Sequence, residues 1–388
     1  MKKPIIFICA FIYILCFSIF SFSDFGNLHK TYASSDDLSI TAKSALLIDY
    51  DSETVIYEKN SHERLPIASM TKLASLAVIF DAIENGIVKE NDIVRVSENA
   101  ASIGGSSAFL DAGSSYKVTD LIKTVIIASA NDSTVALAEH LNGSEEIFVT
   151  KMNKFASNLK LENTNFVNST GLPADNHYSS ANDMAKIYKQ ICNNEIYKKY
   201  SKIWMEDFIH PSGRKTGLVN TNRLIRTFDG IEGGKTGYTD SAKFCLTASA
   251  LRGSTRLIGV VIGVGDSKTR FAEMSKLFSF GFAGYENQVI VNSEIPVTIS
   301  SVKKSNDKIE VYPERNSQIF SEKVKQKKYT VDYKINDIVA PLKSGDIVGK
   351  LFVFDENNMV VDELNLITRT DVSRENLKDI LNKLVSIW

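Results

Sequence analysis

The feature that most constrains the fold is an apolar, helix-forming segment that contains a single charge. Between Ser69 and Asp81 the only charged residue is Lys72, and most of the other positions are apolar. A helix that is apolar nearly all round belongs inside a domain rather than on its surface. An amino group there costs several kcal/mol unless it is paired or neutral, which makes Lys72 a functional candidate.

A serine one helical turn before this lysine suggests a chemical reason for its burial. Ser69 and Lys72 share one face of a helix that is predicted over residues 69–84 and ends at Asn85-Gly86. The free N–H groups at the start of such a helix favour negative charge on an acyl oxygen. A neutral lysine accepts a proton from a serine hydroxyl, so the pair can act as nucleophile and base.

Two further motifs complete a candidate acyl-transfer site. Ser129-Ala130-Asn131 interrupts a helical pattern over residues 119–141, and Lys235-Thr236-Gly237 follows Gly233-Gly234. A hydroxyl and an amide in such a break can relay a proton and hold a peptide group. Lys235 would lower the pKa of a nearby Lys72, and Lys235 and Thr236 can bind a carboxylate. Without its context, however, the Ser129–Asn131 segment is more typical of a helix cap.

Each motif is weak alone, because each recurs elsewhere in the chain. Ser-x-Asn also begins at Ser97 and Ser180, and Lys-Thr-Gly also begins at Lys215. The second Lys-Thr-Gly follows Pro211-Ser212-Gly213 without an apolar strand pattern, which predicts a loop.

The order of periodic segments predicts the organisation of the chain. A hairpin over residues 45–57 precedes helices at 144–159 and 181–193, strands at 244–250 and 257–264, and a helix at 268–282. This order favours an α/β or α+β domain with helices packed on a sheet, over residues 34–285. Alternating runs then predict a small all-β domain at 286–370. Residues 371–388 are predicted to form an amphipathic helix, whose mixed charges favour packing on its own domain over a membrane surface.

The N-terminus predicts export. Lys2 and Lys3 precede an apolar run over residues 4–22, so residues 1–33 are interpreted as a secretory signal peptide and leader. Cleavage could follow Ser23 or Ala33, and an uncleaved anchor is the alternative because the run has nearly the length of a membrane span.

Charge and cysteine content add two expectations. A net charge of −1 gives no indication of nucleic-acid binding. After removal of the signal, Cys192 and Cys245 are the remaining cysteines, and two isolated cysteines favour buried free thiols, with a disulfide as the alternative.

The three motifs in this order resemble those of the serine-type D-alanyl-D-alanine carboxypeptidases, the low-molecular-mass penicillin-binding proteins. The resemblance is close over about residues 40–285 and extends to segments 65–72, 166–173, 177–181 and 230–239. It implies a β-lactamase/transpeptidase-like domain with helices on a mainly antiparallel sheet, followed by the small β domain. The family's terminal helix is often a membrane anchor, which shifts the expectation for residues 371–388 towards the membrane.

The resemblance also implies a role for each site residue. Ser69 would be acylated, Lys72 would be its base, and Lys235 would support the electrostatics of acylation. Ser129 and Asn131 would relay protons and position the peptide. The substrate-binding set would be Thr236, Gly237, Tyr238 and Arg270, with Thr236 and Arg270 on the terminal carboxylate and the N–H groups of Ser69 and Tyr238 as the oxyanion hole. No metal or cofactor is expected.

The implied function is removal of the terminal D-alanine from peptidoglycan stem pentapeptides at the outer face of the bacterial cytoplasmic membrane or in the cell wall, with β-lactams as acylating inhibitors. Alternatives are a transpeptidase or endopeptidase, a β-lactamase, and a catalytically silent penicillin-binding sensor. Three residues depart from the family pattern: Tyr238, Ala130 and the additional Glu232. We expect these departures to affect the rate and the substrate specificity of the enzyme and not the class of reaction.

Overall fold

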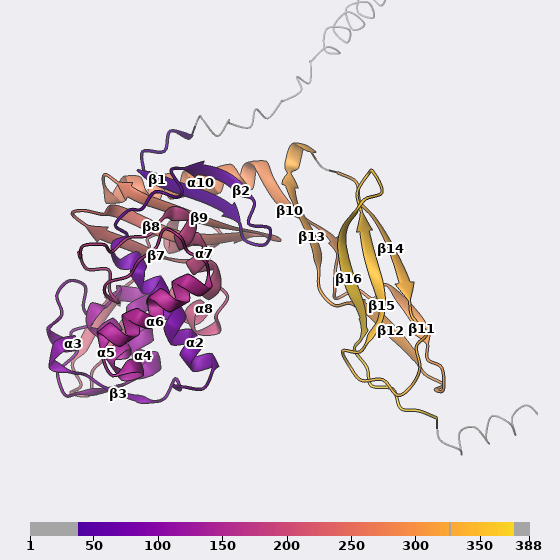
Figure 1. Ribbon diagram of the computed structural model, residues 1–388, viewed down its shortest axis with the longest axis horizontal. Coiled ribbons are helices and arrows are strands. Elements are labelled where there is room, and N and C mark those ends of the chain that lie inside the picture. The colour runs from indigo at the N-terminus through magenta and orange to yellow at the C-terminus, as the bar shows by residue number, and fades with distance from the viewer. Residues whose placement is uncertain (1–37, 326, 376–388) are drawn as a thin grey trace, which may run out of the picture. The chain divides into compact units, whose positions relative to one another are not determined.

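The computed structural model describes residues 38–325 and 327–375 (Figure 1). The predicted signal peptide and leader, residues 1–33, lie outside this part, and so do residues 376–388 of the predicted terminal helix. The prediction is wrong for residues 371–375, which are not helical: Val372 pairs with Leu342 in an antiparallel bridge and is buried in the core of the β domain. No helix among the described residues is long and apolar enough to cross a membrane.

An antiparallel sheet of five strands forms the centre of the first part of the chain, as the resemblance predicted. Its strand order is β2-β1-β9-β8-β7, so the N-terminal hairpin pairs with a strand that lies more than 200 residues later in the chain. The strand bounds are β1 Ser44–Asp49, β2 Val55–Lys59, β7 Ile231–Thr239, β8 Lys243–Arg252 and β9 Thr255–Val264.

Both faces of this sheet are covered by helices, because alternate side chains of its strands are buried in two different hydrophobic cores. In β1 every residue is buried: Leu46 and Ile48 join one hydrophobic core, whereas Ala45 and Leu47 join another. Neighbouring residues of a strand point to opposite faces, so a continuous apolar run needs cover on both sides. The core on the face of Ala45 and Leu47 includes α10 (Ser267–Gly284), and the other core includes the remaining large helices.

The long helices of the larger core correspond to the predicted segments, whereas the short helices α3 (Glu98–Ser102) and α8 (Glu195–Ser201) were not predicted. The nucleophile segment begins as a 3₁₀ turn, Ala68–Thr71, and continues as α2. The predicted 119–141 pattern is divided into α4 and α5 by the Ser129 segment. The bounds are α2 Lys72–Glu84, α3 Glu98–Ser102, α4 Val118–Ala128, α5 Asn131–Asn142, α6 Glu145–Asn158, α7 Ala181–Ile191, α8 Glu195–Ser201 and α9 Leu224–Thr227.

The structure corrects the prediction for the second Lys-Thr-Gly. Lys215-Thr216-Gly217 begins a strand, β6 (Lys215–Val219), which pairs with β5 (Met205–Ile209). The sequence did not indicate this because only Phe208 and Leu218 of the hairpin are buried, so the apolar pattern is short. A second small hairpin, β3 (Ile93–Arg95) with β4 (Ser115–Lys117), was also missed.

The two additional Ser-x-Asn sequences have the structural role that such residues often have. The side chains of Ser97 and Ser180 accept N–H groups at the starts of α3 and α7, as helix caps. Cys192 and Cys245 are buried free thiols, as predicted.

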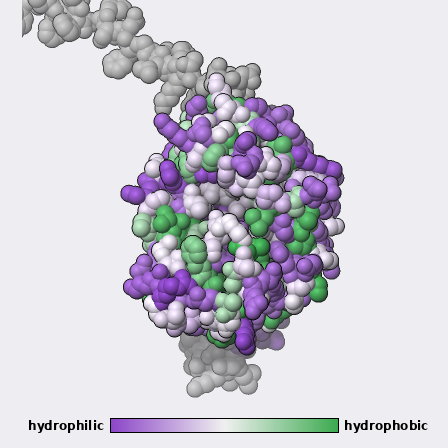
Figure 2. Space-filling view, turned by 90° about the vertical axis from the view of Figure 1, so that its left-hand side faces the viewer, coloured by the Kyte–Doolittle hydropathy of each residue, from purple (hydrophilic) through white to green (hydrophobic). Residues whose placement is uncertain are grey.

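The chain after α10 is built of strands. A sheet of order β11-β12-β16-β15-β14 encloses its own hydrophobic core, and β10 pairs with β13. The bounds are β10 Tyr285–Val291, β11 Thr298–Ser301, β12 Lys308–Pro313, β13 Ser317–Glu322, β14 Thr330–Ile335, β15 Ile347–Phe354 and β16 Val360–Thr368. On the face shown in Figure 2, separate hydrophobic patches lie among hydrophilic residues, as on ordinary protein surfaces.

Phe278 gives a test of the core between the sheet and α10. Its ring is fully buried and lies 5.5 Å from the ring of Phe228, between ring centroids. We expect Phe278→Ala to lower the free energy of unfolding by about 3–5 kcal/mol, because it leaves a cavity. Lys276→Ala, at an exposed position of the same helix, should change it by less than about 0.5 kcal/mol. Denaturant unfolding followed by circular dichroism compares the two variants, and equal effects would contradict this account.

Candidate active site

The start of α2 brings the predicted nucleophile and base together. Lys72 Nζ lies 3.0 Å from Ser69 Oγ and donates to the carbonyl oxygen of Thr170 at 2.7 Å. Lys72 is fully buried, whereas Ser69 is partly exposed. A base that is withdrawn from water therefore contacts a hydroxyl that a ligand can reach.

The electrostatic surroundings favour a neutral Lys72. Its pKa lies well below the usual range, mainly because burial penalises the charged form, and Lys235 lowers it further while Asp132 raises it. Burial also lowers the pKa of Lys235 to about 7, with a smaller contribution from Arg270. Lys235 is buried as well, and its Nζ lies 2.7 Å from Ser129 Oγ.

The break between α4 and α5 presents Ser129 in an unusual backbone conformation. Ser129 has φ 62° and ψ 33°, in the left-handed region that few non-glycine residues adopt. Asn131 donates from Nδ2 to the carbonyl oxygen of Gly104 at 2.6 Å, while its buried Oδ1 has no partner among the described residues. The amide therefore offers a ligand an acceptor, while one of its two N–H donors is bound to Gly104.

Strand β7 passes directly beside the nucleophile segment. A Cβ atom at Gly237 would lie 2.6 Å from the carbonyl oxygen of Ile67, so only glycine fits there. Thr236 Oγ1 donates to Thr221 Oγ1 at 2.8 Å, and the Tyr238 side chain is about half exposed and bonds to Asp240. The predicted substrate-binding residues Thr236 and Gly237 thus lie on the strand next to Ser69.

Arg270 approaches this strand from α10. Its guanidinium donates to the carbonyl oxygens of Gly237 and Cys245 at 3.3 Å, and its buried Nε has no partner among the described residues. Burial lowers the pKa of Arg270 to about 10. A buried arginine without an acidic partner is a candidate anion-binding group.

Three residues that sequence reasoning left without a role support the nucleophile turn. Ala68, directly before Ser69, has φ +48°, and Thr71 Oγ1 donates to its carbonyl oxygen at 2.8 Å. His177 Nε2 lies 2.8 Å from Thr71 Oγ1, and its Nδ1 accepts the N–H of Val167 at 3.1 Å. These contacts hold the strained turn in place. The available signal was the resemblance of segments 166–173 and 177–181 to the family pattern.

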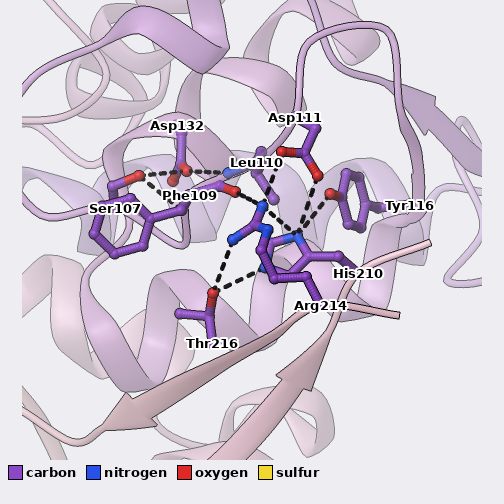
Figure 3. A network of polar contacts seen from close by, with 9 residues as sticks. All are labelled: Ser107, Phe109, Leu110, Asp111, Tyr116, Asp132, His210, Arg214 and Thr216. Atoms are coloured by element: carbon purple, nitrogen blue, oxygen red, sulfur yellow. Dashed lines mark hydrogen bonds and ion pairs between the residues drawn. The ribbon is translucent and has the colours of Figure 1, made fainter. Parts of the chain in front are cut away.

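The loop before β4 is fixed to the start of α5 through one carboxylate (Figure 3). Asp132 accepts Ser107 Oγ at 2.6 Å and the N–H groups of Ala108 and Leu110 at 3.0 Å. Arg214 of the β5–β6 hairpin donates to the carbonyl oxygen of Phe109 at 2.6 Å and holds the same loop from the other side. Asp132 therefore holds the backbone of residues 107–110 beside Asn131.

The same network explains the second Lys-Thr-Gly. His210 Nε2 lies 2.8 Å from Thr216 Oγ1, and His210 Nδ1 lies 2.9 Å from the hydroxyl of Tyr116 (Figure 3). Lys215 is exposed and pairs with Asp207 at 3.5 Å. Thr216 thus helps to anchor the hairpin, and Lys215 lies on its surface.

The additional residue before the third motif is accommodated by a β-bulge. The pairing of β7 with β8 shifts register between Ile231 and Gly233, so Glu232 is the extra residue. Both carboxylate oxygens of Glu232 bind Arg256, at 2.8 and 2.9 Å. This bidentate pair fixes the bulge, and the register after it places Lys235 opposite Thr247.

Gly171 gives a test of the nucleophile turn. It has φ +83°, and a Cβ atom would lie 1.9 Å from the carbonyl oxygen of Ala68. We expect Gly171→Ala to slow acylation of Ser69 by a fluorescent penicillin roughly 100-fold, because the turn must move. Gly213→Ala is the matched control, since Gly213 also has φ +83° but has open space around it. If both variants reacted at the same rate, the close approach would have no effect on the nucleophile.

Comparisons with known proteins agree with this arrangement. Residues 30–266 match the D-alanyl-D-alanine carboxypeptidase family, peptidase family S11, and residues 285–374 match the C-terminal domain of penicillin-binding protein 5. The chain is 40% identical over 356 residues to the D-alanyl-D-alanine carboxypeptidase DacF of Bacillus subtilis, which covers 91% of each protein.

Solved structures show the same fold. Penicillin binding protein 5 from Haemophilus influenzae superposes with a TM-score of 0.66 at 32% identity, covering 86% of this chain and 98% of that one. A mutant of a Streptomyces DD-transpeptidase superposes with a TM-score of 0.59 at 26% identity, covering 63% of this chain and 99% of that one. The match over residues 30–266 and the 40% identity to DacF lead to one conclusion: the chain belongs to the serine-type D-alanyl-D-alanine carboxypeptidase family, the low-molecular-mass penicillin-binding proteins.

Proposed function

We propose that the protein removes the terminal D-alanine from peptidoglycan stem pentapeptides through an acyl-enzyme on Ser69, and that β-lactams acylate the same serine. The observation that carries this proposal is the buried Lys72 amine at 3.0 Å from Ser69 Oγ. An uncharged amine in that position is a base, and the pair needs no histidine to generate a nucleophile.

Substrate binding uses side chains that have unused hydrogen-bonding capacity among the described residues. Asn131 Oδ1 accepts the N–H of a peptide bond in the substrate, because it is buried without a partner. The carboxylate of the terminal D-alanine binds Thr236 and Arg270, since the guanidinium lacks an acidic partner and Thr236 lies on the adjacent strand. The backbone N–H groups of Ser69 and Tyr238 form the oxyanion hole.

Acylation and hydrolysis then depend on the two lysines. Lys72 takes the proton of Ser69 as the serine oxygen bonds to the carbonyl carbon. As the C–N bond breaks, the Ser129 hydroxyl gives its proton to the leaving amine and receives the proton held by Lys72, so both side chains return to their starting forms. Lys235, beside Ser129 Oγ at 2.7 Å, stabilises the charge that develops. A water molecule enters the place of D-alanine and hydrolyses the ester through the same groups.

The alternatives differ in the fate of the acyl-enzyme. A transpeptidase or endopeptidase shares the acylation step, and a catalytically silent sensor would remain acylated. A β-lactamase needs a deacylating carboxylate. Glu162, in the segment Leu161-Glu162-Asn163, is exposed, and Glu145 binds the N–H and hydroxyl of Ser169 at 2.8 and 2.6 Å. Release of D-alanine from a pentapeptide separates the carboxypeptidase from these alternatives.

Location and domain roles are part of the same proposal. A substrate in the cell wall requires export, which agrees with the signal peptide predicted over residues 1–33. We place the catalytic domain at residues 34–285 and the β domain at 286–370. We also propose that residues 376–388 bind the outer face of the cytoplasmic membrane, as the family resemblance implies, whereas Val372 belongs to the core of the β domain.

Ser69 provides the direct test of the acyl-enzyme. Intact mass after penicillin treatment should show one adduct on the wild-type protein, and peptide mapping should place it on Ser69. Ser69→Ala should show no adduct and release no D-alanine, because the attacking oxygen is gone. An adduct that persists in Ser69→Ala would exclude Ser69 as the nucleophile.

The two Lys-Thr-Gly sequences provide an internal comparison. Lys235→Ala should reduce acylation roughly 100-fold or more, because it removes a buried group of the proton-transfer system. Lys215→Ala should stay within about twofold of wild type, because its exposed ion pair contributes little. Acylation rates with a fluorescent penicillin test this, and a large loss in Lys215→Ala would mean that the wrong motif was chosen.

The pH dependence of acylation tests the charge on Lys235. With a pKa of about 7, Lys235 loses its charge as the pH rises through neutrality, while burial holds the pKa of Lys72 well below its usual value. The second-order acylation rate should therefore fall above pH 7 with an apparent pKa near that value, since this constant reports the free enzyme. Lys235→Arg keeps its charge well above neutral pH, since even the buried Arg270 has a pKa of about 10, and it should lose this decline. A decline that is unchanged in Lys235→Arg would assign it to another group.

A further inference from the structure

A cavity of about 600 Å³ opens directly beyond the groups proposed to bind the terminal carboxylate. Arg270 and Thr221 line it, and Thr221 accepts the hydrogen bond from Thr236 Oγ1 at 2.8 Å. The cavity is thus continuous with the leaving-group side of the site. It is much larger than the methyl and carboxylate groups of D-alanine require.

The lining of this cavity is strongly cationic. Arg223, Arg226 and Arg270 all line it, and no acidic residue is among its lining residues. Across the described part of the chain, none of the three has a carboxylate within salt-bridge distance. Arg270 is 6% exposed and its Nε has no partner, so the charge at the inner end is buried and uncompensated.

The three arginines differ in their exposure to solvent. Arg223 and Arg226 are exposed on and beside α9, whereas Arg270 is buried. Arg223 is close enough to lower the pKa of Arg270, so positive charges lie near one another here without a carboxylate among the lining residues to balance them. The guanidinium of Arg226 lies 5.2 Å from the ring centroid of the partly buried Trp204, which adds an apolar wall.

We propose that this cavity is a leaving-group subsite for amines that carry a second anionic group beyond their α-carboxylate. It rests on the proposed function, in which the α-carboxylate binds Thr236 and Arg270. The second anionic group binds Arg223 and Arg226, and the chain between the two lies against Trp204. Acidic D-residues and the peptide chains of cross-linked stem peptides have this chemistry.

The reaction is the same as with D-alanine. The Ser69 oxygen bonds to the carbonyl carbon of the penultimate D-alanine, the C–N bond breaks, and the leaving amine takes the proton. Water then hydrolyses the ester, so no further reactant is needed. Only the group that departs is larger and more negatively charged.

The test compares leaving groups that differ in charge at nearly constant size. The substrates are an acyl-L-Lys-D-Ala-D-Xaa series in which Xaa is D-Ala, D-Gln, D-Glu or the longer D-2-aminoadipate. We expect the wild-type kcat/KM for the better acidic substrate to exceed that for D-Gln by about tenfold, because guanidinium–carboxylate contacts are charge-assisted. Added salt should reduce this ratio.

Charge-removing variants locate the effect. Arg223→Gln with Arg226→Gln should bring the ratio of acidic to D-Gln substrate close to one. Arg95→Gln, an exposed arginine of β3 outside the cavity, should keep the wild-type ratio. The ratio is measured within each variant, so it does not depend on the amount of folded protein. A ratio unchanged in the double variant would overturn the subsite.

A cross-linked dimer distinguishes the two sources of the second anionic group. Cleavage that is lost in the double variant would identify the peptide chain as an occupant, whereas a preference confined to D-Glu and D-2-aminoadipate would identify a free acidic side chain. Equal wild-type rates for D-Gln and both acidic substrates, without dimer cleavage, would overturn the subsite alone. Release of no residue from any of the four peptides would overturn the proposed function and the subsite with it.

Discussion

The active site depends on keeping two amines out of water and next to two hydroxyls. Lys72 and Lys235 are buried, and each lies within 3.0 Å of a serine oxygen, Ser69 for one and Ser129 for the other. Burial of an ammonium group is unfavourable, so the fold lowers the pKa of both amines, and for Lys72 it favours the uncharged form that can act as a base. Much of the domain can be understood as the scaffold that enforces this burial.

That scaffold is built from segments that are distant in the sequence. The sheet pairs β1 with β9, and β7 lies at its edge beside the 3₁₀ turn that carries Ser69. The Glu232–Arg256 pair fixes the bulge that sets the register of Lys235. A change of one residue in that register would move Lys235 to the other face of the sheet. The positions of the catalytic groups are therefore properties of the whole domain.

The sequence predicted the parts of the structure where a local pattern and its environment agree. The apolar segment after Ser69, the break at Ser129 and the strands 244–250 and 257–264 all have clear local sequence patterns, and the structure contains each of them. The antiparallel sheet and the family came from the resemblance carried by the motifs. The assignment of roles to the site residues remains a prediction, although contacts link Ser69 with Lys72 and Ser129 with Lys235.

Other features could not be predicted because they depend on tertiary contacts. The β5–β6 hairpin has few buried residues, so its strand pattern was too weak and Lys215 was assigned to a loop. The importance of Gly171 arises from the Ala68 carbonyl oxygen, about 100 residues earlier in the chain. His177 reaches the nucleophile turn through Thr71 in the same way. The sequence showed Glu232 only as an additional residue before the third motif. Its ion pair with Arg256 could not be predicted, because it depends on the position of β9 beside the bulge.

The buried oxygen of Asn131 has a consequence for the energetics of the whole domain. A buried acceptor without a donor costs on the order of 1–3 kcal/mol relative to the same atom in water. A ligand that donates an N–H to this oxygen offsets that cost, so peptide binding and the stability of the catalytic domain are thermodynamically linked.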